Sequence, residues 1–269
     1  MADRVYRTTT FTTRQLVESI DRGDLALPDL QRPFVWPNSK VRDLLDSMYR
    51  GFPVGYLLLW ATDAEPGARA IGDGPQRAAV ARWLIVDGQQ RLTSLFSMMT
   101  GREVVHDDYS TSRIRIAFRP RDGQFVVANA SSDRNVEYIP DVTELWKKYR
   151  PTTRAFFARY EEARGELDDD TREAWEDAID RVRDLQSFQF DVVELDPEVD
   201  EERVAEIFVR INSEGVKLNQ SDFILTLMSV FWDEGRTQLE EFSRAAKLPS
   251  TSAASPFNWY LQPSPDQLL

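Results

Sequence analysis

The sequence predicts an α+β fold, with its strands mostly in the first half of the chain and helices dominating the second half. Two continuous apolar runs of strand length, Val54 to Trp60 and Trp83 to Val86, precede a third at Phe190 to Leu195. An alternating segment from Ile114 to Phe118 returns through Phe125 to Ala128 after an Arg-Asp-Gly turn, which is typical of a β-hairpin.

The expected helices are segments whose apolar residues repeat on one face between stop signals. They run from Thr13 to Gly23, 38 to 51, Gln89 to Gly101, 175 to 185, 204 to 215 and Ser221 to Trp232. We therefore expect an α+β core over residues 1–130 and a mainly helical part over residues 131–269 that packs on it. The last six residues resemble the start of a helix, which predicts that the chain was cut from a longer protein.

Composition excludes several kinds of chemistry. The 269 residues include no cysteine, which rules out disulfides, zinc ribbons and thiolate nucleophiles. The single histidine, His106, excludes paired-histidine metal sites, and its loop-like acidic surroundings predict no catalytic role. No apolar run is long enough to span a membrane and no signal core is found at the N-terminus, so we expect a cytoplasmic protein.

The net charge of −12 is concentrated in one segment. Residues 161–206 carry 19 acidic and 5 basic side chains, so the rest of the chain has a net charge of +2. We interpret the acidic run as a solvated helical face. The charge distribution thus leaves room for a phosphate-binding surface elsewhere in the chain.

The segment Asp87-Gly88-Gln89-Gln90-Arg91 is the first candidate site, because it joins a buried strand to a helix through a glycine. The N–H groups at such a helix start suit a phosphate, and Gly88 allows close approach of the backbone. Asp87 could hold Mg²⁺, Gln89 or Gln90 could orient a water, and Arg91 could make a forked phosphate contact. In the structural alternative, the aspartate and glutamines only satisfy the amides of the turn.

Two further segments place polar groups in apolar surroundings. The first segment runs from Leu30 to Trp36, and its Gln31 and Arg32 could form a rigid fork of hydrogen-bond donors. Alternatively, the segment is a packing loop in which Arg32 pairs with a nearby aspartate. In Arg210 to Gly215, Arg210 and Asn212 could serve a site, although a helix end closed by Gly215 explains most of this segment.

These motifs together resemble one family. Leu30 to Trp36, Arg50 to Gly55, Val86 to Thr93 and Phe208 to Gly215 are similar, in order, to the GmrS-like N-terminal domain of GmrSD-type modification-dependent restriction enzymes. They also resemble the N-terminal domain of SspE-type phosphorothioate defence proteins. The resemblance covers most of the chain and implies a fold akin to the ParB and sulfiredoxin group, with a small mixed sheet and a helical remainder.

The resemblance also implies a function. It implies binding and hydrolysis of a nucleoside triphosphate, GTP or another, with Mg²⁺ at Asp87, through Asp87, Gly88, Gln89, Gln90 and Arg91. Gln31 and Arg32 match the loop that faces this motif, and we add Arg210 and Asn212 as nucleotide contacts. Relatives often carry a C-terminal His-Asn-His nuclease domain, which this chain lacks, so the nuclease is expected in a C-terminal or separate domain.

We therefore expect an NTPase domain that regulates DNA cleavage in a restriction and antiviral defence system. Its expected partner is DNA, modified or unmodified, and homo-oligomerisation is an option. The alternative is a DNA-binding or modification-sensing module that does not hydrolyse nucleotide, in which Gln31, Arg32 and Arg91 contact phosphates. A third hypothesis is a nuclease that uses Asp87 and other carboxylates around Mg²⁺.

Overall fold

The computed structural model describes residues 5–26, 36–62, 81–105, 110–212, 224, 228, 232–250 and 254–269. Its strands are β1 (Tyr6–Thr12), β2 (Leu25–Ala26), β3 (Leu57–Ala61), β4 (Trp83–Asp87), β5 (Val104–Val105), β6 (Thr111–Ser112), β7 (Ile116–Arg119), β8 (Gln124–Val127) and β9 (Gln189–Leu195). Its helices are α1 (Thr13–Arg22), α2 (Asn38–Tyr49), α3 (Gln89–Thr100), α4 (Ala130–Arg134), α5 (Thr143–Lys147), α6 (Tyr149–Arg164), α7 (Asp169–Asp184), α8 (Glu201–Asn212), α10 (Asp233–Lys247) and α11 (Pro265–Leu268), with a 3₁₀ turn at Leu185–Ser187. The α+β class is confirmed.

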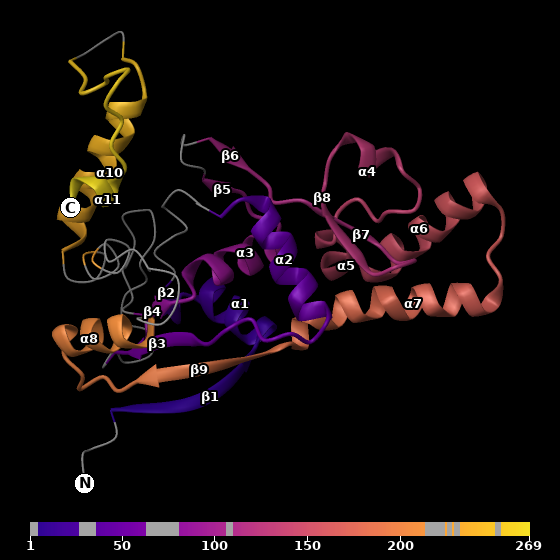
Figure 1. The fold of residues 1–269 in the computed structure, drawn as a ribbon, viewed down its shortest axis with the longest axis horizontal. Coiled ribbons are helices and arrows are strands. Elements are labelled where there is room, and N and C mark those ends of the chain that lie inside the picture. Colours follow the sequence, from indigo (N-terminus) through magenta and orange to yellow (C-terminus); the bar gives the residue numbers. More distant parts are fainter. Residues whose placement is uncertain are drawn as a thin grey trace.

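Five strands form one mixed sheet in the order β1-β9-β3-β4-β2. The pairs β1·β9 and β3·β4 are antiparallel, whereas β9·β3 and β4·β2 are parallel. Strand β9 comes from the second half of the sequence, yet it lies between β1 and β3 (Figure 1). The sheet therefore draws on both halves of the chain, and the expected division at residue 130 stays a prediction.

Both faces of the sheet are covered, which explains why β3 and β4 are continuous apolar runs. Leu57, Leu59 and Ile85 face the helices α1, α2 and α3, and they share one buried cluster with the side chains of those helices. The alternate residues of β3 and β4 point to the other face, where they pack with Val204 and Phe208 of α8. This alternation follows from the two-residue period of a strand.

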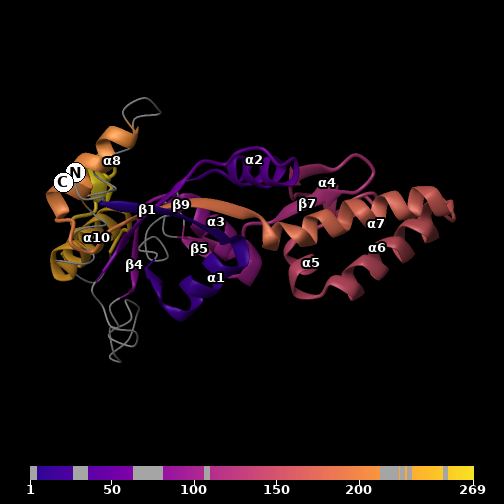
Figure 2. The ribbon, with the colours of Figure 1, turned by 90° about the horizontal axis from the view of Figure 1, so that it is seen from below.

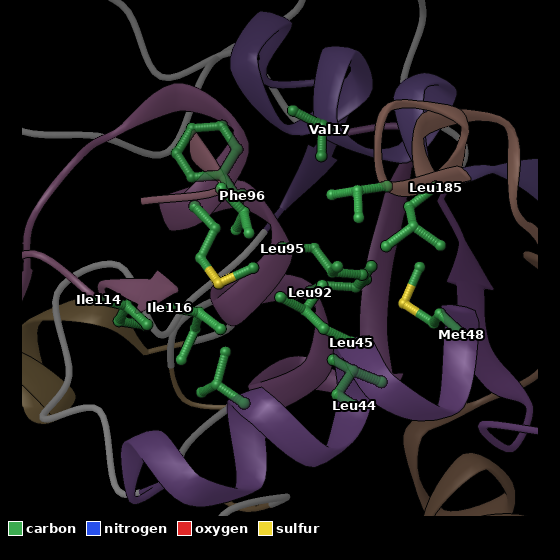
Figure 3. Close-up of a cluster of buried hydrophobic side chains, with 14 of the residues drawn as sticks. Val17, Leu44, Leu45, Met48, Leu92, Leu95, Phe96, Ile114, Ile116 and Leu185 are labelled. Atoms are coloured by element: carbon green, nitrogen blue, oxygen red, sulfur yellow. The ribbon is translucent and has the colours of Figure 1, made fainter. Parts of the chain in front are cut away.

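The larger core lies between α1, α2, α3 and the 3₁₀ turn after α7. Figure 3 shows Val17, Leu45 and Leu92 meeting there from three different helices. Ile116 extends this core toward the β7–β8 hairpin, and Phe156 and Trp175 belong to the same cluster. The site-bearing helix α3 is therefore held on several sides by buried side chains.

Helices α6 and α7 form an antiparallel pair that extends to one end of the molecule, away from both marked termini (Figures 1 and 2). Helix α7 has the expected stabilising ends, because Asp168 caps it and its last turn carries Arg181 and Arg183. Its acidic residues follow the amphipathic pattern that the sequence indicated, with Trp175 and Ile179 buried.

The structure differs from the sequence-based expectations in a few places. Strand β3 begins at Leu57 and not at Val54, because Gly55 has a φ of +83° and breaks the extended run. Strand β1 and helix α6 were not expected. The expected helix from Ser221 to Trp232 lies largely outside the described residues. In the part of the chain that the structure describes, no helix is both long and apolar enough to cross a membrane.

Candidate functional site

The segment from Asp87 to Arg91 forms the turn between β4 and α3. Asp87 ends β4, Gly88 is the N-cap residue, and the first helical hydrogen bond joins the Leu92 N–H to the Gly88 carbonyl at 3.0 Å. Among the described residues, no side chain caps this helix, and its first turn carries no acidic residue. Since a helix start attracts negative charge through its dipole and its N–H groups, this terminus suits an anion such as phosphate.

Gly88 is required by packing as well as by conformation. Its φ of +98° is in the left-handed region, which favours glycine. A Cβ atom on Gly88 would also lie 2.3 Å from Cδ2 of Leu57, a fully buried side chain of β3. The sequence suggested that this glycine admits a ligand to the backbone, but the contact with Leu57 is sufficient to explain it.

We expect Gly88→Ala to lower the free energy of unfolding by about 2–3 kcal/mol. The left-handed conformation contributes about 1 kcal/mol of this loss, and the forced contact with Leu57 contributes about 1–2 kcal/mol. Gly51→Ala is the matched control, since Gly51 also has a positive φ (+70°) but a Cβ there would meet nothing within 4 Å. Urea unfolding of both variants measures the difference; equal losses would show that the Leu57 contact is unimportant.

The Arg91 guanidinium ties the turn to a neighbouring segment. Its Nη2 donates to Oδ2 of Asp87 at 3.1 Å, and its Nη1 donates to the Val54 carbonyl at 2.7 Å. The Arg91 side chain is 14% exposed and the Asp87 side chain 21%. Burial lowers the pKa of Arg91, and the Asp87 carboxylate opposes that shift. Two of the five guanidinium donors are thus engaged within the protein, and one of these contacts holds the Asp87 carboxylate.

The turn at Val54 and Gly55 belongs to this site, although sequence reasoning placed it inside a strand. A Cβ atom on Gly55 would lie 2.7 Å from Nη1 of Arg91, so the glycine leaves space for the guanidinium. A single glycine within an apolar run is a known sign of a bend or of close packing. That glycine is the signal by which the contact with Arg91 could have been suspected.

Both glutamines of the motif bond backbone groups. Nε2 of Gln89 donates to the Ile85 carbonyl at 3.2 Å, and Oε1 of Gln90 accepts from the Trp36 N–H at 3.3 Å. Because Trp36 ends the Leu30 to Trp36 motif, the second bond joins two motifs that lie 54 residues apart. These contacts agree with the structural alternative for the glutamines. A role of either glutamine toward water or a ligand stays a prediction.

The structure describes only some of the other expected site residues. Arg210 lies in the last turn of α8, where it pairs with Glu206 at 2.5 Å and is 77% exposed. Asn212 ends α8, but its side chain lies outside the described residues, as do Gln31, Arg32 and His106. The expected convergence of Arg32 with Asp87 therefore stays a prediction.

The donor set at the junction suits one kind of metal ion. Within the described residues, no group of three or more His, Cys, Asp or Glu side chains could hold a metal. Asp87 alone offers carboxylate oxygens in the turn between β4 and α3. Magnesium usually takes one or two protein carboxylates and completes its shell with water and substrate phosphates. The residues present therefore fit a magnesium–nucleotide complex.

The fold and the site define an α+β domain with a mixed sheet and an anion-attracting helix start at its strand–glycine–helix junction. The family model described as the GmrSD restriction endonuclease, N-terminal domain, matches residues 13–229. The chain therefore belongs to the GmrSD restriction endonuclease N-terminal domain family, which confirms the resemblance seen in the motifs. A restriction-enzyme context follows from this membership.

One relative also matches part of the chain. It is a protein of Methanocaldococcus jannaschii named "Uncharacterized protein MJ0686", with 34% identity over 90 residues. The match covers 30% of this chain and 15% of that protein. The chain thus spans a small part of this relative, whose name carries no activity to transfer.

Proposed function

We propose that this domain binds a nucleoside triphosphate, GTP or another NTP, with Mg²⁺, hydrolyses it, and thereby regulates DNA cleavage by the restriction protein to which it belongs. The observation that carries this proposal is the start of α3, which no described side chain caps and which only Gly88 separates from Asp87. The helix start suits the phosphates, and the Asp87 carboxylate suits the cation that accompanies them.

Each motif residue has a role in this proposal. Asp87 holds Mg²⁺, which neutralises charge on the phosphate oxygens when it is bound. Gln89 or Gln90 orients the water whose oxygen attacks the γ-phosphorus while the bond to the β–γ bridging oxygen breaks, releasing NDP and phosphate. Arg91 keeps the Asp87 carboxylate in place through the 3.1 Å contact. Gln31, Arg32, Arg210 and Asn212 supply further contacts to the nucleotide.

The DNA-cleaving step belongs to another part of the system in this proposal. A His-Asn-His nuclease needs two histidines, and this chain has one. The nuclease is therefore a C-terminal domain of a longer chain or a separate subunit, and homo-oligomerisation is one way to bring such parts together. Modified DNA bound by the whole protein is the signal that we expect to alter NTP turnover.

The first test is binding of a non-hydrolysable NTP analogue. At a free concentration about a hundredfold above its Kd, the analogue stabilises the folded protein by about 2.7 kcal/mol. We expect that gain in thermal unfolding with Mg²⁺ and a smaller one with EDTA, because the carboxylate and the phosphates share the cation. No shift with GTP, ATP, CTP or UTP analogues would contradict a nucleotide site.

A hydrolysis assay with and without modified DNA separates this proposal from its rival. Phosphate release that depends on Mg²⁺ supports an NTPase. DNA binding by a protein that releases no phosphate under any of these conditions supports a DNA-binding or modification-sensing module that does not hydrolyse nucleotide. Plasmid nicking by the chain alone would instead support the hypothesis of a nuclease centred on Asp87.

A further inference from the structure

Residues 145–160 differ in charge from the rest of this acidic protein. They contain five basic side chains and no acidic one, although the whole chain has a net charge of −12. The segment covers the end of α5, the junction at Lys148 and most of α6. We call four of its exposed side chains the basic surface: Lys147, Lys148, Arg150 and Arg154.

The four side chains of the basic surface have no charged partner among the described residues. Within the part of the chain that the structure describes, none of them has a carboxylate within 4.0 Å or a side-chain hydrogen bond. Some exposed arginines elsewhere are paired, such as Arg50 with Asp46 at 2.8 Å. Those without a described partner, such as Arg121 and Arg164, are scattered, so the basic surface is distinguished by its clustering. The basic surface thus presents uncompensated positive charge to solvent.

The stability of α6 gives no reason for this arrangement. Lys148 is the N-cap residue, Arg150 is in the first turn, and that turn has no acidic residue. The dipole disfavours a cation at a helix start, typically by about 0.3–1 kcal/mol. Helix α7 shows the opposite and favourable pattern, with Asp168 as its cap and Asp169 and Asp170 in its first turn. Lys147 and Lys148 also end α5, where the dipole favours cations, so it is Arg150 in the first turn of α6 that an external anion would explain.

The basic surface lies at the base of the α6–α7 pair, and the acidic residues around Asp169 lie at its outer end (Figures 1 and 2). It also adjoins the C-terminal end of α3, because a Cβ atom on Gly101 would lie 2.0 Å from Nζ of Lys147. With 12 residues, α3 is roughly 18 Å long. One helix thus connects the candidate nucleotide site at its start with the basic surface at its end.

We propose that the basic surface binds the phosphate backbone of duplex DNA. Exposed lysines and arginines suffice for such contacts, which position a duplex without reading its sequence. Arg150 and Arg154 are four residues apart on α6, so they lie on one face about 6 Å apart. The acidic outer end of the pair repels phosphate and confines the duplex to the base. The choice of DNA rests on the restriction function, but the surface does not depend on nucleotide hydrolysis.

The test removes three of the charges at once. We expect the variant Lys148→Gln, Arg150→Gln, Arg154→Gln to bind a fluorescent duplex roughly 10- to 100-fold more weakly near 0.15 M salt, without nucleotide. The slope of log K against log salt should shrink by about 2–3, since each lost phosphate contact removes about 0.9. The variant should melt at the same temperature as wild type or slightly higher, because it removes cations from a helix start.

The matched control is Arg121→Gln, Arg134→Gln, Arg164→Gln, which changes the net charge equally at exposed positions outside the basic surface. Its affinity for the duplex should change by less than about threefold, as long-range charge effects are screened. Equal weakening of DNA binding in both variants, or no weakening in the first, overturns the proposal.

Altered self-association with unchanged DNA binding would assign the surface to a protein partner. Wild-type protein that binds DNA but never hydrolyses NTP would refute the proposed hydrolysis and leave this surface standing.

Discussion

Asp87→Asn should lower NTP turnover by about a hundredfold or more while the protein stays folded. Asp87 ends β4 beside the start of α3, which no described side chain caps, and we propose that its carboxylate holds Mg²⁺ against the phosphates there. Asparagine keeps the shape and an oxygen that can accept from Arg91, but it lacks the negative charge that strengthens magnesium binding. The loss in stability should therefore be limited to about 1–2 kcal/mol, as for a weakened hydrogen bond to a charged group.

Turnover and melting temperature must be measured on the same preparation. A sequence-based alternative makes Asp87 a cap of α3, in which case its loss would reduce stability by about 1 kcal/mol and spare turnover. The described structure does not favour that alternative, because the cap position is Gly88 and no described side chain caps the helix. His106→Ala is a useful control, as we expect it to leave turnover intact. Normal turnover in Asp87→Asn with a lowered melting temperature would move the active site elsewhere.

The parts of the fold that could be predicted are those with a local signal. Strand β4 and helix α3 were expected within a residue of their observed bounds, because an apolar run, a glycine and a helical period follow one another in sequence. Strand β9 was also recognised by its apolar run, although its position between β1 and β3 depends on pairing across the whole chain. Sequence periodicity contains no information on such long-range pairing.

The missed elements lacked a clear local pattern. Strand β1 is mostly exposed and rich in threonine, and it is stabilised by pairing with β9, from Tyr6 opposite Leu195 to Thr12 opposite Gln189. Helix α6 fully buries only Phe156 and Phe157, and its apolar face is otherwise completed by the partly buried Tyr149 and Tyr160, so the stripe is sparse. In both cases tertiary packing, rather than local preference, determines the structure.

In the candidate site too, local features could be predicted from the sequence and contacts between distant residues could not. The strand–glycine–helix turn and Asp87 at its start are local features, and the sequence predicted both. The partner of Arg91 is the Val54 carbonyl, which lies 37 residues earlier inside an apparent strand. Sequence reasoning therefore assigned the guanidinium to a phosphate, whereas in the structure two of its N–H groups bind protein oxygens.

Arg91→Met should lower the free energy of unfolding by about 3–4 kcal/mol. The substitution keeps much of the side-chain volume, but it leaves the Asp87 carboxylate and the Val54 carbonyl without their donors in a largely buried place. In the double variant with Asp87→Asn, the total loss should be smaller than the sum of the single losses, because the two residues share one contact. Urea unfolding of the wild type, the two single variants and the double variant measures this coupling. Strictly additive losses would mean that the Asp87–Arg91 contact contributes little to stability.

The same four proteins decide whether Arg91 acts through Asp87 or on the nucleotide. A positioning residue affects turnover through the carboxylate that it holds, so Arg91→Met should add little to the loss of kcat already caused by Asp87→Asn. A residue that contacts phosphate directly would weaken binding of the NTP analogue by a similar factor in both backgrounds. Since the guanidinium already donates to Asp87 and Val54, we expect the first result. A loss of analogue affinity that persists when Asp87 is replaced would place Arg91 among the groups that bind the phosphates.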